Sequence, residues 1–200
     1  MIVALMGVCG SGKTAVGQAL AADLDWPFFD GDDFHPPANV AKMAAGAPLT
    51  DADRWPWLDR LAAEMAAVNE RGGDAVLACS ALKQAYRDRL SRAGNVRFVH
   101  LSGDYDTIAA RLAARSHRYM PPTLLASQFA TLEAPQDAVV VDVGDSIPAQ
   151  IAKIRTALQL ATSVGPAYVG PASVGLALAG RPDLASCAPP EGGPTIGRDR

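Results

Sequence analysis

The residues with the clearest chemical potential run from Gly7 to Thr14 and read G-V-C-G-S-G-K-T. This order matches G-x-x-x-x-G-K-[ST], the P-loop, in which glycines let backbone N–H groups face a phosphate. Lys13 is expected to reach the β- and γ-phosphates as a point charge, and Thr14 to ligate Mg²⁺. The residues predicted to bind ATP are Gly7, Val8, Cys9, Gly10, Ser11, Gly12, Lys13 and Thr14.

Acidic residues follow the apolar run from Trp26 to Phe29. Asp30, Asp32 and Asp33 stand within D-G-D-D, and His35 comes shortly after them. Ligands of open α/β sheets bind beyond the carboxyl ends of the strands, which places these acids where a substrate is expected. Carboxylates this close repel one another unless a cation or a polyol lies between them. The alternative is a solvated acidic turn.

Two further segments carry polar or basic residues. Ser80 and Lys83 follow the apolar run from Ala75 to Cys79, again at the end of an expected strand. The basic loop 115–122 contains Arg115 and Arg118 and ends in two prolines, and the helix before it carries Arg111. These arginines are predicted to close over the phosphates as a lid, because phosphoryl transfer spreads negative charge. An ordinary surface loop is the alternative.

Apolar runs alternate with amphipathic segments along the first 160 or so residues. We expect strands at 2–6, 26–29, 75–79, 96–101 and 138–142, and helices at 14–24, 39–45, 53–71, 86–93, 104–114, 124–132 and 147–161. Thr50-Asp51-Ala52-Asp53 is a helix-capping signal. Alternation of this kind predicts an α/β fold, a five-stranded parallel sheet with helices on both faces. Residues 164–200 are rich in Gly, Pro and Ala and are expected to form a disordered tail after a domain at 1–163.

Composition excludes several classes of protein. The chain has 200 residues, of which 49% are hydrophobic, enough for one cored domain. A net charge of −3 argues against a nucleic-acid partner, and no run reaches the about 18 apolar residues of a membrane span. Cys9, Cys79 and Cys187 form no C-x-x-C pair, which favours a reducing cytoplasm. A homodimer stays open.

The P-loop leaves the reaction open, because kinases, GTPases and ATPases share it. The guanine-reading pattern N-K-x-D and the switch motif D-x-x-G are both absent from the sequence. A short chain with one P-loop, a candidate lid and polar clusters after two strands favours a kinase that acts on a small molecule. Kinases for shikimate or a nucleoside monophosphate remain alternatives, as does a nucleotide-binding regulatory protein.

Longer blocks of sequence resemble the gluconokinases of the P-loop type. The blocks beyond the P-loop are 30–39 (DGDDFHPPAN), 42–43 (KM), 48–58 (PLTDADRWPWL), 78–87 (ACSALKQAYR) and 127–133 (SQFATLE). The resemblance implies phosphorylation of D-gluconate at its 6-hydroxyl by ATP, on a fold like that of shikimate and nucleoside monophosphate kinases. The chain departs from the usual pattern at Cys9, Ala15 and Tyr119, and these departures alter loop packing rather than charge.

The resemblance also implies roles for individual residues. The shikimate kinase layout implies that Asp30 lies near Mg²⁺ and that Asp32 faces the acceptor, and both would share one face if the segment were extended. With Lys13 and Arg115 they form the expected catalytic set. The acceptor is expected to contact Asp32, Asp33, His35, Arg54, Ser80, Lys83, Arg87 and Gln128. Carboxylates suit the hydroxyls of gluconate, and Arg54, Lys83 and Arg87 suit its acid group. Trp55 and Trp57 are expected in the core, as helix-spaced aromatic residues commonly are, and contact of their flat faces with the sugar chain is the alternative.

Overall fold

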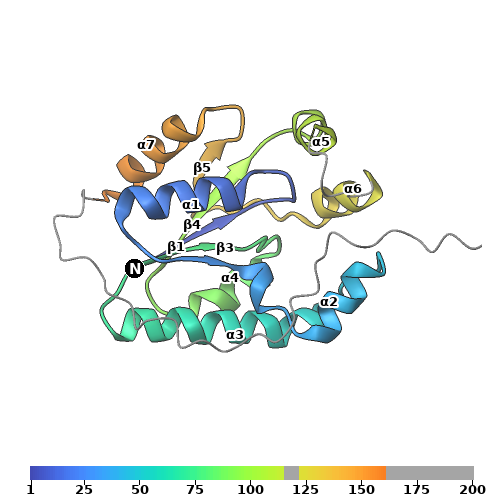
Figure 1. The fold of residues 1–200 in the computed structure, drawn as a ribbon, viewed down its shortest axis with the longest axis horizontal. Coiled ribbons are helices and arrows are strands. Elements are labelled where there is room, and N and C mark those ends of the chain that lie inside the picture. The colour runs from blue at the N-terminus through green and yellow to red at the C-terminus, as the bar shows by residue number, and fades with distance from the viewer. Residues whose placement is uncertain (115–121, 161–200) are drawn as a thin grey trace, which may run out of the picture. The chain divides into compact units, whose positions relative to one another are not determined.

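The described part of the chain forms a parallel sheet covered by helices on both faces. The computed structural model describes residues 1–114 and 122–160. Five strands occur in these ranges: Ile2–Met6 (β1), Phe28–Asp30 (β2), Ala75–Ala78 (β3), Val96–Ser102 (β4) and Val139–Asp142 (β5). Their order across the sheet is β2-β3-β1-β4-β5, and every pair is parallel (Figure 1). The predicted fold class is confirmed.

Helices connect the strands in alternation. They are Lys13–Leu24 (α1), the short 3-10 helix Gly31–Phe34 (η1), Pro37–Ala44 (α2), Asp51–Glu70 (α3), Gln84–Ser91 (α4), Tyr105–Ala113 (α5), Pro122–Thr131 (α6) and Ile147–Leu158 (α7). Most ends differ from the expected ranges by one to three residues, as caps and frayed turns allow. β2 lies later than expected, because Phe28 pairs with Val76 and Asp30 with Ala78. Residues 115–121 of the predicted lid at 115–122, and the predicted tail at 164–200, lie outside the described residues, while Pro122 begins α6.

The unbroken apolar run of β1 serves two cores at once. Its side chains alternate between the faces of the sheet, as the pleat requires. Val3 and Leu5 pack with α1 and α7, while Ile2, Ala4 and Met6 pack with α3 and α4. All five side chains are buried. β1 is therefore the central strand to which both layers of helices attach.

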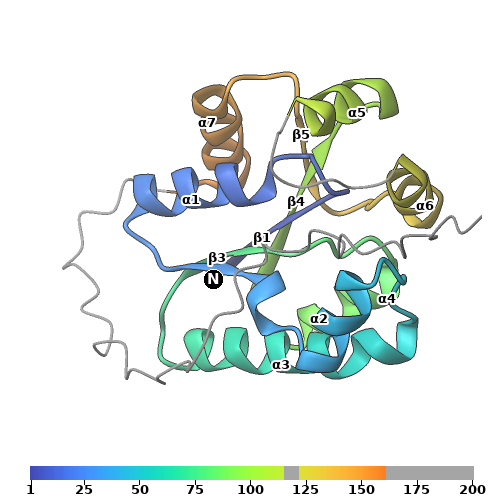
Figure 2. The same ribbon diagram turned by 45° about the vertical axis from the view of Figure 1, so that its right-hand side comes forward.

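The order of the strands brings three loops together at one end of the sheet. β1, β2 and β3 are neighbours and run in the same direction, so their carboxyl ends lie side by side. The P-loop, η1 and the loop before α4 follow these three strands in turn. Figures 1 and 2 both show α2 and α6 at this end of the molecule. Polar residues that are distant in sequence therefore meet here.

Among the described helices, none combines the length and the hydropathy that a membrane crossing requires.

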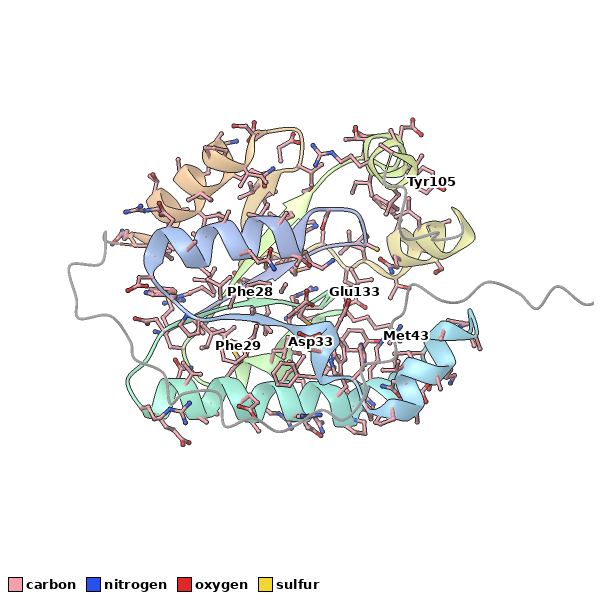
Figure 3. All side chains as sticks on the ribbon, in the orientation of Figure 1. Phe28, Phe29, Asp33, Met43, Tyr105 and Glu133 are labelled. Carbon is pink, nitrogen blue, oxygen red and sulfur yellow. The ribbon has the colours of Figure 1, made fainter. Side chains whose placement is uncertain are left out.

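Gly17 lets α1 lie close to the sheet. A Cβ atom at Gly17 would be 2.5 Å from Cε2 of Phe28 and 3.1 Å from Cδ1 of Leu5. Figure 3 shows Phe28 beside α1. Alanine favours a helix over glycine by about 1 kcal/mol, but overpacking costs about 1 to 3 kcal/mol. Gly17→Ala is therefore expected to lower the free energy of unfolding by about 1 kcal/mol, measured by urea denaturation.

The exposed neighbour Gln18 provides the control on the same helix. Gln18→Ala is expected to change the free energy of unfolding by less than about 0.5 kcal/mol. A Gly17→Ala protein more stable than the parent would show that α1 does not need this close approach.

Candidate active site

The P-loop backbone requires its glycines. Gly7, Gly10 and Gly12 have φ angles of +141°, +85° and +95°, a region that other residues rarely adopt. A Cβ atom on Gly7 would lie 2.8 Å from the carbonyl oxygen of Leu101, and one on Gly10 would lie 2.7 Å from Cγ of Leu112. The loop therefore has the tight backbone curvature that the motif predicts.

The start of α1 offers N–H groups to an anion. Gly12 is the N-cap and provides no side-chain cap, and the N–H groups of Lys13 and Thr14 find no acceptor in the described part of the chain. The Oγ atom of Ser11 is buried without a partner there. Free N–H groups at a positive helix end form a phosphate site, so these residues fit the phosphates of a nucleotide.

Lys13 lies across the P-loop. Its Nζ atom donates to the carbonyl oxygens of Gly7 (3.0 Å) and Val8 (3.1 Å). Burial lowers the pKa of Lys13, and the nearby Cys9 and Asp32 act in the opposite direction. A half-buried ammonium group interacts more strongly with a phosphate than one in bulk water, as the prediction for Lys13 requires.

Asp30 joins the P-loop helix to the acidic segment. One carboxylate oxygen accepts a hydrogen bond from Oγ1 of Thr14 (3.0 Å), and the other accepts from the N–H of Asp32 (3.1 Å). The expectation of an extended segment after Asp30 is wrong, because residues 31–34 form η1 with Asp30 as its N-cap. Gly31 also packs tightly, since a Cβ atom there would lie 2.8 Å from the carbonyl oxygen of Ala78. The side chains of Asp32 and Asp33 are exposed.

Thr14 and Asp30 are the pair predicted to hold a metal ion. Their contact brings a hydroxyl and a carboxylate oxygen to one point, and both oxygens suit Mg²⁺. The described residues contain no group of three or more His, Cys, Asp or Glu side chains that could hold a metal ion. Mg²⁺ usually takes one or two protein ligands and completes its shell with water and phosphate, so a pair of this kind fits it.

A second cluster of charge surrounds Asp51 at the start of α3. Lys83 Nζ donates to both carboxylate oxygens of Asp51 (2.9 and 2.8 Å), and the hydroxyl of Tyr86 donates to one of them (2.5 Å). Nη1 of Arg54 lies 3.8 Å from Asp51 and donates to the Tyr86 hydroxyl (3.3 Å) and to the carbonyl oxygen of Leu49 (2.7 Å). These hydrogen bonds lower the pKa of Asp51 and raise that of Lys83.

Tyr86 is the common support of both cations. Cζ of Arg54 and Nζ of Lys83 each lie 5.6 Å from the centre of its ring, within cation–π range. Two positive groups and one carboxylate leave the cluster one net positive charge. An anion of matching charge is the ligand that this arrangement favours.

His35 lies between the acidic segment and the cation pair. Its ring stacks on Trp57 with centroids 4.2 Å apart, and the Trp57 indole N–H donates to the carbonyl oxygen of Gly31 (2.7 Å). Burial lowers the pKa of His35, while Asp32 raises it and Arg54 lowers it. A neutral ring can both donate to and accept from a hydroxyl. Trp57 is 3% exposed, so it belongs to the core as expected.

Several predicted site residues have protein partners. Arg87 is 3% exposed and donates to the carbonyl oxygens of Ala81 and Leu82 and to the Gln84 side chain. Gln128 accepts a hydrogen bond from the N–H of Cys9 (2.6 Å), and Arg111 donates to the carbonyl oxygen of Val143. Substrate contacts of Arg87 and Gln128 stay predictions. Ser80 is half-buried beside the P-loop, and Arg115 and Arg118 lie outside the described residues.

Sequence reasoning missed Asp51 and Tyr86 as part of the site. Asp51 stands in a clear helix-capping signal, where an acid needs no further explanation. Tyr86 stands at a helical position, where aromatic residues commonly belong to the core. The hydrogen bond between them joins residues 35 positions apart, so no local sequence pattern predicts it.

The fold and the site define a class of protein. A parallel sheet with a P-loop after its central strand, acids after β2 and a cation pair from α3 and the loop after β3 is the arrangement of a small-molecule kinase. Residues 9–149 match the shikimate kinase family.

Individual relatives show which kind of small-molecule kinase this chain resembles. The chain is 46% identical over 148 residues to the thermosensitive gluconokinase of Escherichia coli. The matched residues cover 72% of this chain and 79% of that relative. It is 42% identical to a probable gluconokinase of Xenopus tropicalis, covering 78% and 92%. The crystal structure of a gluconokinase from Sinorhizobium meliloti superposes with a TM-score of 0.72 at 40% identity, covering 78% and 90%. The chain belongs to the gluconokinases of the shikimate kinase family.

Asp53 makes the stability of the fold depend on pH. Its carboxylate accepts from Lys42 (2.6 Å) and from the N–H and hydroxyl of Thr50 (2.6 and 2.7 Å), and these bonds lower its pKa. A lowered folded-state pKa stabilises the fold above the unfolded value of about 4, and the gain is lost as the pH falls below it. Asp53→Asn is therefore expected to lower the urea midpoint at pH 7, with a smaller difference near pH 3.

Asp33 provides a control carboxylate, because it is exposed and no protein partner contacts it in the described part of the chain. Asp33→Asn is expected to change the midpoint little at either pH. A difference between Asp53→Asn and the parent that is the same at both pH values would exclude a contribution from the Asp53 charge.

Proposed function

We propose that this protein transfers the γ-phosphoryl group of ATP to the 6-hydroxyl of D-gluconate and releases 6-phospho-D-gluconate and ADP. The observation that carries the proposal is the cation pair of Arg54 and Lys83, held together by Asp51 and Tyr86 next to the acidic segment and the P-loop. A phosphate site alone would fit many kinases. A carboxylate-binding pair beside carboxylates that suit hydroxyl groups fits a sugar acid.

The acceptor is oriented by its two chemically different ends. Arg54 keeps guanidinium N–H groups beyond the one that contacts Leu49 and Tyr86, and these would bind the carboxylate of gluconate, with Lys83 adding charge. His35, Asp33 and Asp32 would take the hydroxyls along the carbon chain. Binding the acid group at the far end leaves the C6 hydroxyl toward Lys13 and the P-loop.

The transfer step needs in-line positioning and neutralised charge more than it needs a strong base. ATP supplies the phosphoryl group, and Mg²⁺ supplies neutralising charge at the phosphates. Asp32 would accept the hydrogen bond of the 6-hydroxyl and hold it in line. Thr14 and Asp30 would hold the metal ion, and Lys13 would remain on the transferred group. Asp32 acts on Lys13 electrostatically, which agrees with their being close to the same phosphate.

Arg111, Arg115 and Arg118 are proposed to close over the phosphates once both substrates are bound. In the described structure Arg111 contacts the carbonyl oxygen of Val143, so closure requires this side chain to exchange one partner for another. A cytoplasmic location is proposed with this activity, because ATP and sugar acids are substrates of central metabolism. A homodimer stays an untested prediction.

A coupled assay of ADP release tests the proposal. The purified protein is offered ATP and Mg²⁺ with gluconate, shikimate or a series of nucleoside monophosphates, and only gluconate is expected to give rapid turnover. Lys13→Ala serves as the control for the P-loop and is expected to lower kcat by a factor of about 10³, the scale of a lost charge-stabilising group. Turnover with shikimate or a nucleotide instead of gluconate would overturn the substrate assignment.

Asp32 and Arg54 should give separable kinetic defects. Asp32→Asn is expected to lower kcat by about 10²-fold or more, because its carboxylate acts in the transition state, while the KM for gluconate changes little. Arg54→Ala is expected to raise the KM for gluconate by about tenfold and to leave the KM for ATP unchanged, because its guanidinium binds the acid group. Steady-state kinetics with each substrate varied in turn decides between them. An Arg54→Ala defect in ATP binding would require new roles.

A further inference from the structure

The loop between β3 and α4 is held in a strained conformation. Ala81 has a φ angle of +42°, in the left-handed region that residues with a Cβ atom rarely adopt, and it is 1% exposed. Such a conformation persists only when the surroundings hold it, and it is common at functional sites. The residue that this loop delivers is Lys83, the N-cap of α4.

Contacts from the P-loop and from α4 hold the first part of the loop. The N–H of Gly7 donates to the carbonyl oxygen of Ser80 (3.2 Å). Nη1 of Arg87 donates to the carbonyl oxygens of Ala81 (3.0 Å) and Leu82 (3.1 Å). The guanidinium group therefore satisfies two carbonyls that no ladder of the sheet reaches. The carbonyl oxygen of Lys83 accepts from the N–H groups of Tyr86 and Arg87 (3.1 and 3.3 Å). These contacts leave the N–H of Gln84, the first residue of α4, without a partner.

Glu133, in the segment after α6, supplies that partner. Its N–H donates to the carbonyl oxygen of Leu82 (2.9 Å), and its carboxylate accepts from the N–H of Gln84 (2.5 Å). The two bonds hold the backbone of the residues immediately before and after Lys83. Figure 3 shows Glu133 at the end of the sheet that carries the P-loop, in the region where Asp33 and Met43 also lie.

Lys83 cannot cap its own helix. Its side chain reaches Asp51 with Nζ, and it offers no oxygen to the N–H groups of α4. The carboxylate of Glu133 takes the place of an N-cap and puts a negative charge at the positive end of the helix. Glu133, 49 positions after Gln84 in the sequence, thus accepts the N-terminal N–H of α4 that an N-cap Ser or Asp accepts in many helices.

We propose that Glu133 is a positioning residue for the acceptor, which caps α4 from outside and fixes the backbone on both sides of Lys83. The acceptor part of this inference rests on the proposed gluconate kinase activity. Loss of the cap would let Lys83 move away from Asp51 and Arg54, and the site would hold the acid group of the acceptor less well. No hydrogen bond or ion pair joins Glu133 to the P-loop residues 7–14, which are all described, so nucleotide binding would be unaffected.

Kinetics of Glu133→Ala and Glu133→Gln tests the acceptor role. Glu133→Ala is expected to raise the KM for gluconate by about fivefold, the scale of a lost helix cap, with kcat and the KM for ATP unchanged. Glu133→Gln keeps an oxygen that can accept from Gln84 and is expected to show a smaller rise. A fall in kcat or a changed KM for ATP would overturn the role, as would an unchanged KM for gluconate.

Amide hydrogen exchange without any ligand tests the cap itself. The first turn of α4 is expected to exchange faster in Glu133→Ala than in the parent, with Glu133→Gln between the two. Asp104 is the matched control, because its carboxylate caps α5 through the N–H of Thr107 (2.7 Å). Asp104→Ala is expected to leave both the exchange of α4 and the KM for gluconate unchanged. Unchanged exchange in Glu133→Ala would overturn the cap.

The two measurements separate this inference from the proposed function. A parent protein that does not phosphorylate gluconate would refute the proposed function and the acceptor role together, while the exchange experiment would still decide whether Glu133 caps α4. A parent protein that phosphorylates gluconate, together with Glu133 variants of unchanged KM, would refute the positioning role alone.

Discussion

The position of β3 between β1 and β2 is the constraint on which the site depends. Because all three strands are parallel neighbours, the P-loop, η1 and the loop that leads to Lys83 emerge at the same end of the sheet. The hydrogen bond from the N–H of Gly7 to the carbonyl oxygen of Ser80 then joins the phosphate loop directly to the acceptor loop. A shift of β3 relative to β1 would move the phosphate site and the acceptor site relative to each other. In-line transfer tolerates such a displacement poorly, since the reacting atoms must lie close together and aligned.

Charge is distributed along the site in a consistent order. The positive end of α1 and Lys13 lie at one end, the acids of the β2 segment follow, and the net positive cluster around Asp51 lies at the other end. His35 stands between the last two, within the electrostatic reach of both Asp32 and Arg54. A ligand that is anionic at both ends and rich in hydroxyls in the middle matches this order. Gluconate aligned with the γ-phosphate of ATP has that pattern, whereas a nucleoside monophosphate presents a base where the cation pair lies.

The backbone of the P-loop could be predicted from the sequence, and the contacts that hold the acceptor-side residues together could not. Residues 7–14 are contiguous, so the pattern alone predicts the backbone shape that the positive φ angles of Gly7, Gly10 and Gly12 show. The 3-10 helix after Asp30 was missed because an acid that caps its own segment looks the same in sequence as one in an extended strand. Asp51 and Glu133 were missed because their partners are 32 to 49 positions away, and only the folded sheet brings them together. Local propensity carries no information on pairs of this kind.

This difference between the two ends bears on how such a fold acquires a new acceptor. The P-loop acts through backbone N–H groups and tight glycines, so few substitutions preserve it. The acceptor end acts through side chains that hold one another: Lys83 and Tyr86 on Asp51, Arg54 on Tyr86, and Glu133 on the backbone around Lys83. Substituting one of these residues removes a hydrogen bond that holds another in place, so the acceptor site is sensitive to single substitutions. For the same reason, a few coordinated substitutions can rearrange the site. Because that network contacts α3, α4 and the segment after α6 rather than α1, its reorganisation can proceed without loss of the nucleotide site.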